Sequence, residues 1–137
     1  MLSNNIFSRL IAIVLFILYA FVPCNPDGLT LSATADNGEE QVITVEWQNN
    51  TKKAIGIPRY FVEKNENGEW TEIPFSDGFG FPDIASTYYP TEKGEITIIS
   101  ERVFGQRLPE GKYRITVYYD ILNSDIKTGS SVLEFTL

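Results

Sequence analysis

The sequence predicts an all-β domain, an antiparallel sandwich of about seven strands, preceded by an apolar N-terminal helix. Short stretches in which polar and apolar residues alternate are separated by turn-forming residues, which is typical of a sandwich. No amphipathic helical pattern occurs after the apolar N-terminal run. The predicted strands are residues 29–34, 41–48, 55–64, 69–74, 94–100, 112–120 and 131–137.

Residues 10–22 form an unbroken apolar run that follows Arg9. A short positive segment followed by such a run is typical of a secretory signal. Thirteen helical residues rise about 20 Å, less than the ~30 Å hydrocarbon core of a bilayer. We therefore expect residues 1–24 to be a signal peptide or membrane anchor, with Arg9 inside and the domain, residues 29–137, on the extracytoplasmic side.

Cys24 follows this run closely and resembles the lipid-modified cysteine of bacterial lipoproteins. Pro23 departs from the small residue that usually precedes that cysteine, and the run has no clear Ala-x-Ala cleavage site. Three outcomes stay open: lipidation at Cys24, an uncleaved anchor, or cleavage with secretion. The first two make the membrane a partner of the N-terminal segment.

The first two strands are bounded by turns. Residues 29–34 alternate and end before the turn Asp36-Asn37-Gly38. Residues 41–48 alternate strongly, and we expect Ile43, Val45 and Trp47 to face the core. The polar segment that follows contains Asn49-Asn50-Thr51, formally a glycosylation acceptor, which we interpret only as a turn.

The next two strands form a predicted hairpin. Pro58 should confine the strand 55–64 to a sheet edge or to a bulge, because proline cannot donate to a strand ladder. The segment Asn65–Gly68 fits a hairpin loop, and the chain returns as residues 69–74.

Residues 75–92 have no periodicity and are rich in glycine, proline and aromatic residues. Long irregular loops are commonly functional. Exposed aromatic rings there would stack on a sugar or hold a peptide. Alternatively, the rings fold back and cover one end of the core. The candidate binding loop is Phe75, Phe79, Phe81, Tyr88 and Tyr89.

The stretch from Leu108 to Asp120 combines a tight turn with a strand. In this strand we expect Tyr113, Ile115, Val117 and Tyr119 to face the core. The pattern Leu108-x-x-Gly111-x-Tyr113 is that of a tyrosine corner, in which the tyrosine hydroxyl bonds back to the preceding turn. We therefore assign Tyr113 a structural role.

With the segment from Tyr60 to Pro74, this motif resembles a family of bacterial immunoglobulin-like domains found in cell-envelope lipoproteins. The resemblance covers about residues 29–137. It implies an immunoglobulin-like sandwich on the outer side of a bacterial membrane, and it supplies no catalytic residues.

Composition narrows the function further. The formal net charge is -7, which argues against nucleic acid as a partner. The chain has no histidine, and Cys24 is its only cysteine, so we expect neither an enzyme nor a zinc site nor a cofactor. Carboxylates such as Glu46 and Glu134 could still pair in space. The acidic cluster Asp36, Asn37, Glu39 and Glu40 matches no calcium loop and is interpreted as a solvated turn.

Topology adds an expectation about the two ends of the sandwich. The segments 36–40 and 65–68 and Glu110 should share an acidic pole opposite the start of the first strand. The aromatic loop should begin at the membrane side, and some of its rings should reach the lipid interface. We predict a membrane-tethered binding or structural module of the cell envelope with an unknown protein or glycan ligand; the alternative is an inhibitor of extracytoplasmic proteases acting through a loop.

Overall fold

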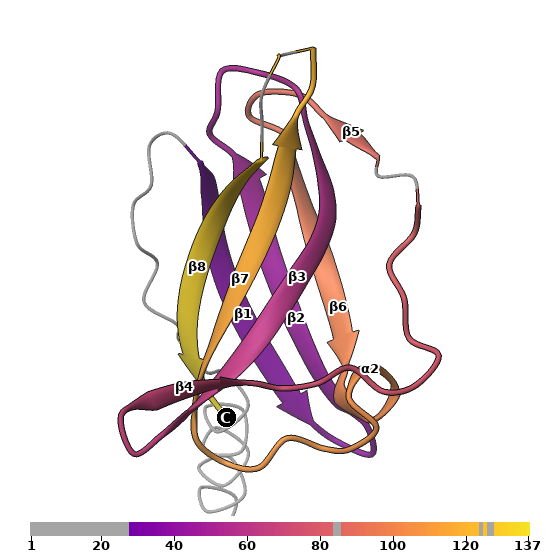
Figure 1. Ribbon diagram of the computed structural model, residues 1–137, viewed down its shortest axis with the longest axis vertical. Helices are drawn as coiled ribbons and strands as arrows, with labels where there is room; N and C mark the ends of the chain where they lie inside the picture. The colour runs from indigo at the N-terminus through magenta and orange to yellow at the C-terminus, as the bar shows by residue number, and fades with distance from the viewer. Residues whose placement is uncertain (1–27, 84–85, 124, 126–127) are drawn as a thin grey trace, which may run out of the picture.

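Two antiparallel sheets face each other in the computed structural model, which describes residues 28–83, 86–123, 125 and 128–137 (Figure 1). The first sheet has the order β1 (Leu29–Asn37), β2 (Gln41–Asn49) and β6 (Lys93–Ile99). The second has the order β4 (Glu69–Glu72), β3 (Ile55–Glu66), β7 (Lys112–Ile121) and β8 (Thr128–Thr136), and β5 (Thr87–Tyr88) pairs with the start of β3. The predicted all-β sandwich is confirmed, with eight strands in the described part. Residues 1–24, including Cys24 and the predicted helix, lie outside the described residues.

One helical turn interrupts the all-β pattern. The sequence predicts a strand through Ser100 and then a turn, whereas the structure has the helix α2 (Ser100–Val103). The Phe104 amide donates to the Ser100 carbonyl at 2.8 Å, and Val103 and Phe104 are buried. A single turn is too short to show helical periodicity, which is why the sequence pattern missed it. Across the described ranges, none of the helices has both the length and the apolar character that a membrane span requires.

The core lies between the sheets and follows the predicted alternation. Ile43, Val45 and Trp47 of β2 are buried, as expected. The inward residues of β7 are buried as predicted: Tyr113, Ile115, Val117 and Tyr119. Trp47 lies over Gly94 of β6, its cross-strand partner, where a Cβ would come within 2.8 Å of the indole Cε2 atom. Glycine at this position makes room for the tryptophan.

Pro58 lies at an irregularity of β3, as predicted. The register between β3 and β7 shifts between Gly56 and Arg59. A bulge of this kind adds residues to one strand and re-aims the side chains beside it. Arg59 therefore emerges from the bulge directly opposite Tyr118 of β7.

The sandwich has two poles, named here after the described chain ends. At the N-terminal pole, β1 begins beside the β2–β3 turn, and the Asn50 amide donates to the Gly28 carbonyl at 2.9 Å. At the C-terminal pole, Gly111 and Leu137 exchange backbone hydrogen bonds of 3.0 and 2.9 Å. The β1–β2 turn, the β3–β4 turn and α2 lie at the C-terminal pole (Figure 1).

Candidate functional site

The structure separates the five aromatic residues of the predicted binding loop. Phe75 stacks on Phe79 and on Phe104, with ring centroids 4.9 and 5.9 Å apart. Phe81 lies 5.0 Å from Tyr60, edge to face. These three loop phenylalanines are partly buried against the core. Together they cover the part of the core that lies next to β3.

The two loop tyrosines lie at the opposite end. Tyr88 packs against Trp47, with centroids 4.4 Å apart, and is also partly buried. Tyr89 is 60 % exposed, more than any other large hydrophobic side chain in the described ranges. The predicted loop therefore contains one protruding ring.

The loop begins at the C-terminal pole, so the expectation that it begins beside the start of β1 is wrong. The Ser76 amide donates to the Val103 carbonyl and its hydroxyl donates to the Arg102 carbonyl, both at 2.8 Å. The physical reason is the length of β4, which pairs with β3 only between Glu63 and Glu66. The chain leaves the sheet before it has travelled toward the other pole.

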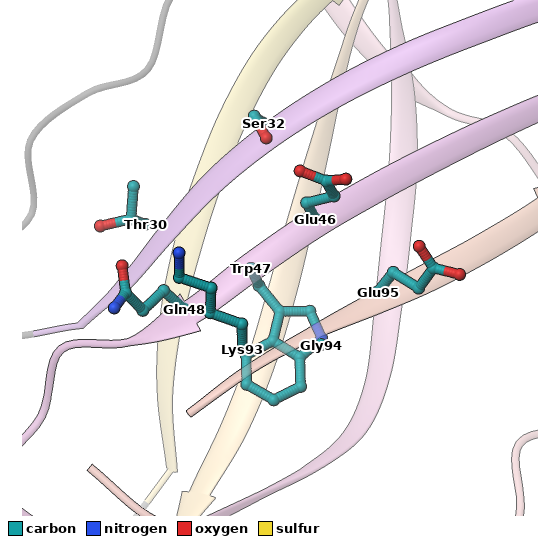
Figure 2. Close-up of a pocket in the computed structure, with 8 residues that line it drawn as sticks. All are labelled: Thr30, Ser32, Glu46, Trp47, Gln48, Lys93, Gly94 and Glu95. Atoms are coloured by element: carbon teal, nitrogen blue, oxygen red, sulfur yellow. The ribbon is translucent and has the colours of Figure 1, made fainter. Parts of the chain in front are cut away.

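The outer face of the β1–β2–β6 sheet, here called the β2 face, is polar. Figure 2 shows a shallow groove on it with Glu46 and Glu95 side by side. These glutamates are direct cross-strand partners, an arrangement that is unfavourable for like charges. Glu134 lies on the other sheet, paired with Lys112 at 3.4 Å, so the possible pairing of Glu46 with Glu134 does not occur. The groove lining is Thr30, Ser32, Glu46, Trp47, Gln48, Lys93, Gly94 and Glu95.

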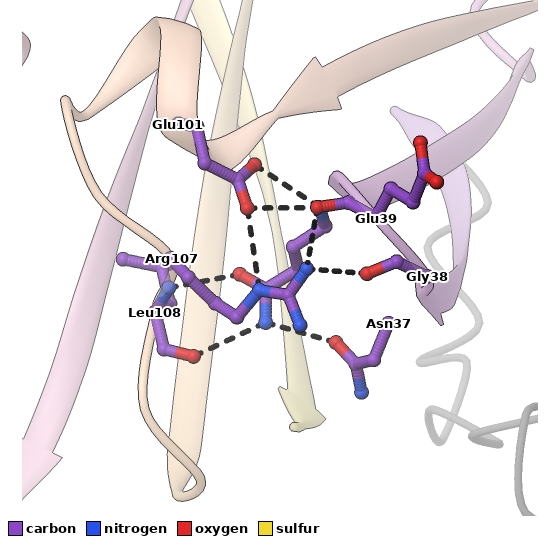
Figure 3. Close-up of polar contacts among 7 residues, drawn as sticks. Asn37, Gly38, Glu39, Glu101, Arg107 and Leu108 are labelled. Atoms are coloured by element: carbon purple, nitrogen blue, oxygen red, sulfur yellow. Dashed lines mark hydrogen bonds and ion pairs between the residues drawn. The ribbon is translucent and has the colours of Figure 1, made fainter.

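A polar network at the C-terminal pole joins β2 to the segment before β7 (Figure 3). The Gln41 side chain accepts from the Leu108 amide at 2.9 Å and donates to the Leu108 carbonyl at 3.1 Å. Glu101 accepts from the Gln41 amide at 3.0 Å and from Arg107 at 3.2 Å. Hydrogen bonds from backbone amides, together with Arg107, lower the pKa of the Glu101 carboxyl. The network is structural, because its polar groups form hydrogen bonds with one another.

The acidic turn between β1 and β2 also makes polar contacts at this pole. The Asn37 side chain accepts from Gln41 at 2.9 Å, and Glu40 pairs with Arg102 at 2.9 Å. Within residues 28–83, 86–123, 125 and 128–137, no group of three or more acidic, cysteine or histidine side chains is arranged to hold a metal ion.

The outer face of the β4–β3–β7–β8 sheet, here called the β7 face, has a different character. Strand register aligns its residues in rows: Arg59, Tyr118 and Ser130; Phe61, Thr116 and Val132; Glu63, Arg114 and Glu134. Phe61 and Tyr118 are half-buried and meet edge to face, with centroids 5.7 Å apart. Val132 is 43 % exposed. An outward sheet face is usually polar, so these two aromatic rings distinguish the β7 face from the β2 face.

Two arginines complete the β7 face. Arg114 binds the Glu63 carboxylate with two hydrogen bonds of 2.8 and 3.1 Å and lies 4.4 Å from the Trp70 ring. The hydrogen bond to Glu63 raises the Arg114 pKa. Arg59 lies 5.0 Å from the Tyr118 ring and 5.9 Å from the Phe61 ring. Among the described residues, no carboxylate pairs with Arg59, whereas Arg102, Arg107 and Arg114 each have a glutamate.

The β7 face was not predicted from the sequence. Phe61 and Tyr118 occupy outward positions of two strands that lie far apart in the sequence, and the β3 bulge sets which residue of β3 faces Tyr118. An aromatic residue at an outward position of an alternating strand is the signal that was available. The strand register that brings two such residues together could not be read from the sequence.

Tyr113 makes the hydrogen bond that the tyrosine-corner pattern predicts. Its hydroxyl donates to the Pro109 carbonyl at 2.5 Å, and its ring is fully buried beside Phe135, 5.8 Å away. Burial and the charge of Glu66 raise its pKa to about 12. The residue fixes the turn into β7 and has no exposed surface for a ligand.

Two facing antiparallel sheets and this corner define an immunoglobulin-like domain. A model of the bacterial Ig-like domain matches residues 25–129, and the chain belongs to this family. No curated protein matches the chain. Membership of this family suggests a binding or structural module.

Proposed function

We propose that this protein is a membrane-tethered, extracytoplasmic module that binds a protein partner through its β7 face. The observation that carries the proposal is the contrast between the two outer faces. The β2 face is lined mostly by threonine, serine, glutamine and charged side chains, apart from Trp47 and Val42. The β7 face places aromatic rings, arginine and an exposed valine on one rigid sheet.

The composition of the β7 face is that of an interaction hot spot. Tryptophan, tyrosine and arginine contribute most to protein–protein affinity, especially at the centre of a flat contact. Tyr118 and Arg114 lie on β7, which has a neighbouring strand on each side. The Arg59 guanidinium is already ordered by its position over the Tyr118 ring. The Arg114 guanidinium is ordered by the Trp70 ring and by its ion pair with Glu63. A pre-ordered side chain loses less conformational entropy on binding.

Arg59 gives the proposed partner a chemical character. Its guanidinium lies over the Tyr118 ring, and among the described residues it has no ion-pair partner. Planar guanidinium groups match the geometry of carboxylates. We therefore propose that an acidic group of the partner binds Arg59.

A protein partner fits this face better than a glycan. A sugar ring stacks on the flat face of an aromatic ring, which must be open to solvent. Phe61 and Tyr118 meet at an interplanar angle of 86°, and Arg59 covers part of the Tyr118 ring. The two rings therefore form no common flat platform for a sugar.

The alternative, a protease inhibitor, depends on a protruding loop. Phe75, Phe79 and Phe81 pack inward, so these side chains of the loop do not protrude and would not insert into a protease cleft. Tyr89 protrudes, but from the pole where β1 begins, which is the membrane side in our proposal. We therefore prefer the binding module.

The tether is proposed from the N-terminal sequence, namely Arg9 and the apolar run 10–22. Cell fractionation tests it, and mass spectrometry of the membrane-extracted chain distinguishes lipidation at Cys24 from an intact anchor. Recovery of the chain only in the medium would contradict membrane attachment.

Capture of a partner from envelope extracts tests the β7 face. We expect Arg59→Ala to reduce capture about 30-fold, because hot-spot arginines contribute about 2 kcal/mol or more. Arg102→Ala is the matched control, since it also removes an exposed guanidinium but from the C-terminal pole. Equal loss with both variants, or no loss with either, would contradict the proposed surface.

A further inference from the structure

The N-terminal pole carries an exposed tyrosine and two exposed lysines around the point where the chain enters the domain. Lys52 and Lys53 lie in the β2–β3 turn, and Tyr89 lies in the turn before β6. These turns are far apart in the sequence.

Asn49 holds the two turns together. It is fully buried, and its side-chain amide nitrogen donates to the backbone carbonyls of Lys53 at 3.0 Å and Tyr88 at 3.2 Å. Its amide oxygen accepts from the Thr51 amide at 2.9 Å and from the Thr51 hydroxyl at 2.6 Å. The lysine turn and the tyrosine turn are thus fixed to one side chain. The next residue, Asn50, donates to Gly28.

The turn that carries Tyr89 is rigid and strained. Its amide donates to the Glu92 carboxylate at 2.9 Å, and the Glu92 amide donates back to the Tyr89 carbonyl at 3.1 Å. Thr91 has a φ of 73°, which is rare for a β-branched residue, and its amide donates to the Asn49 carbonyl at 2.8 Å. Strain of this kind persists where the surroundings hold the backbone, and it often marks a functional position.

The charges of the two poles differ. At the N-terminal pole the described charged side chains include Lys52, Lys53 and Lys93 and the acidic residues Glu92, Asp120 and Asp125, and the Glu92 carboxylate binds the backbone of its own turn. The C-terminal pole carries the carboxylates Asp36, Glu39, Glu40, Glu66, Glu69, Glu101 and Glu110. Of these, Glu40, Glu66 and Glu101 pair with Arg102, Lys64 and Arg107, and the others have no ion-pair partner among the described residues. An anionic lipid surface attracts lysine and repels carboxylate, so it would favour the N-terminal pole.

We propose that the N-terminal pole is a lipid-contact surface, with Tyr89 in the headgroup region and Lys52 and Lys53 on anionic headgroups. The inference rests on the proposed tether, which would deliver the chain to the membrane at Gly28. Tyrosine is favoured at membrane interfaces because its ring is apolar and its hydroxyl is polar. The contact would hold the domain upright, with its acidic pole away from the bilayer.

Fluorescence quenching in nanodiscs tests this contact. The full chain, purified from membranes, carries Tyr89→Trp and is placed in discs of phosphatidylglycerol and phosphatidylcholine with bromine near the top of the acyl chains. The control variant is Val132→Trp, which replaces the other exposed large apolar side chain, on the β7 face. Unsubstituted protein gives the background from Trp47 and Trp70. We expect quenching of the Tyr89→Trp signal alone.

Lys52→Gln and Lys53→Gln in the Tyr89→Trp background test the electrostatic part. Each lysine lost should weaken the contact about five-fold in discs with anionic lipid and little in phosphatidylcholine alone. Quenching of Val132→Trp equal to that of Tyr89→Trp, or of neither above background, would overturn the contact while the tether stands. A chain that does not copurify with membranes would overturn the tether itself.

Discussion

The Gln41 side chain pairs with the Leu108 backbone in both directions, accepting from its amide at 2.9 Å and donating to its carbonyl at 3.1 Å. Gln41 is only 2 % exposed, and Leu108 is buried beside it. The Gln41 side chain therefore makes the two hydrogen bonds that a neighbouring strand would otherwise make to the segment leading into the tyrosine corner. This pair links the β1–β2–β6 sheet to the turn before β7.

Replacing Gln41 should be strongly destabilising. We expect Gln41→Ala to lower the free energy of unfolding by about 2–3 kcal/mol, because three side-chain hydrogen bonds are lost and the Leu108 groups stay buried. Urea denaturation measures the change. Gln48→Ala, which loses one exposed bond to the Thr91 carbonyl at 3.2 Å, should cost less than about 1 kcal/mol. Similar losses for both variants would contradict this role.

Trp47 and Gly94 should be energetically coupled. Trp47→Ala should cost about 3–5 kcal/mol, since a buried ring is removed. Gly94→Ala should cost about 1–3 kcal/mol by overpacking, since its Cβ would meet the indole. In the Trp47→Ala background the second change should cost little, so a double-mutant cycle of unfolding free energies reveals the coupling. Additive losses would show that the ring does not occupy this space.

Tyr113 should affect stability in two ways. Tyr113→Phe loses the bond to the Pro109 carbonyl, which should cost about 1 kcal/mol at neutral pH. Because the folded-state pKa of Tyr113 is raised from 10.0 to about 12, its stabilising effect is present below pH 10 and is lost as pH rises through about 12. Urea melts from pH 8 to pH 12 should show a smaller alkaline loss for Tyr113→Phe than for the unsubstituted chain. Tyr118→Phe is the control on the β7 face.

Glu101 should make the domain sensitive to acid. Its folded-state pKa lies below its ordinary value of 4.5, so its stabilising effect is present above that value and is lost as pH falls through the folded-state pKa. Thermal melts in acid should give a shallower pH dependence for Glu101→Gln. Arg107→Ala should remove only part of the effect, because the Gln41 amide still binds the carboxylate. An unchanged slope for Glu101→Gln would contradict this assignment.

The fold was largely predictable because alternation determines which side chains are buried. Ile43, Trp47 and Tyr113 face the core as their positions in the alternating strands predict. The long-range polar contacts were not predictable. Asn49 lies in what the sequence presents as a polar turn, yet it is buried and joins segments that only the fold brings together. Gln41 likewise meets a segment 67 residues away.

The candidate site was harder to predict than the fold. The aromatic loop was a reasonable candidate from composition, but the end of β4 determines where the loop starts and which rings point inward. The β7 face depends on the register of β3 against β7, which shifts at the Pro58 bulge. A register shift changes which residues share a face, and local sequence patterns do not fix it.

Site-specific photo-crosslinking tests the β7 face most directly. A photoreactive phenylalanine analogue replaces Tyr118 on the β7 face or Thr44 on the β2 face of the full chain in cells. If the β7 face binds the partner, position 118 gives a discrete protein adduct that Arg59→Ala abolishes, and position 44 gives none. Adducts at position 44, or adducts at position 118 that Arg59→Ala leaves unchanged, would contradict the proposal.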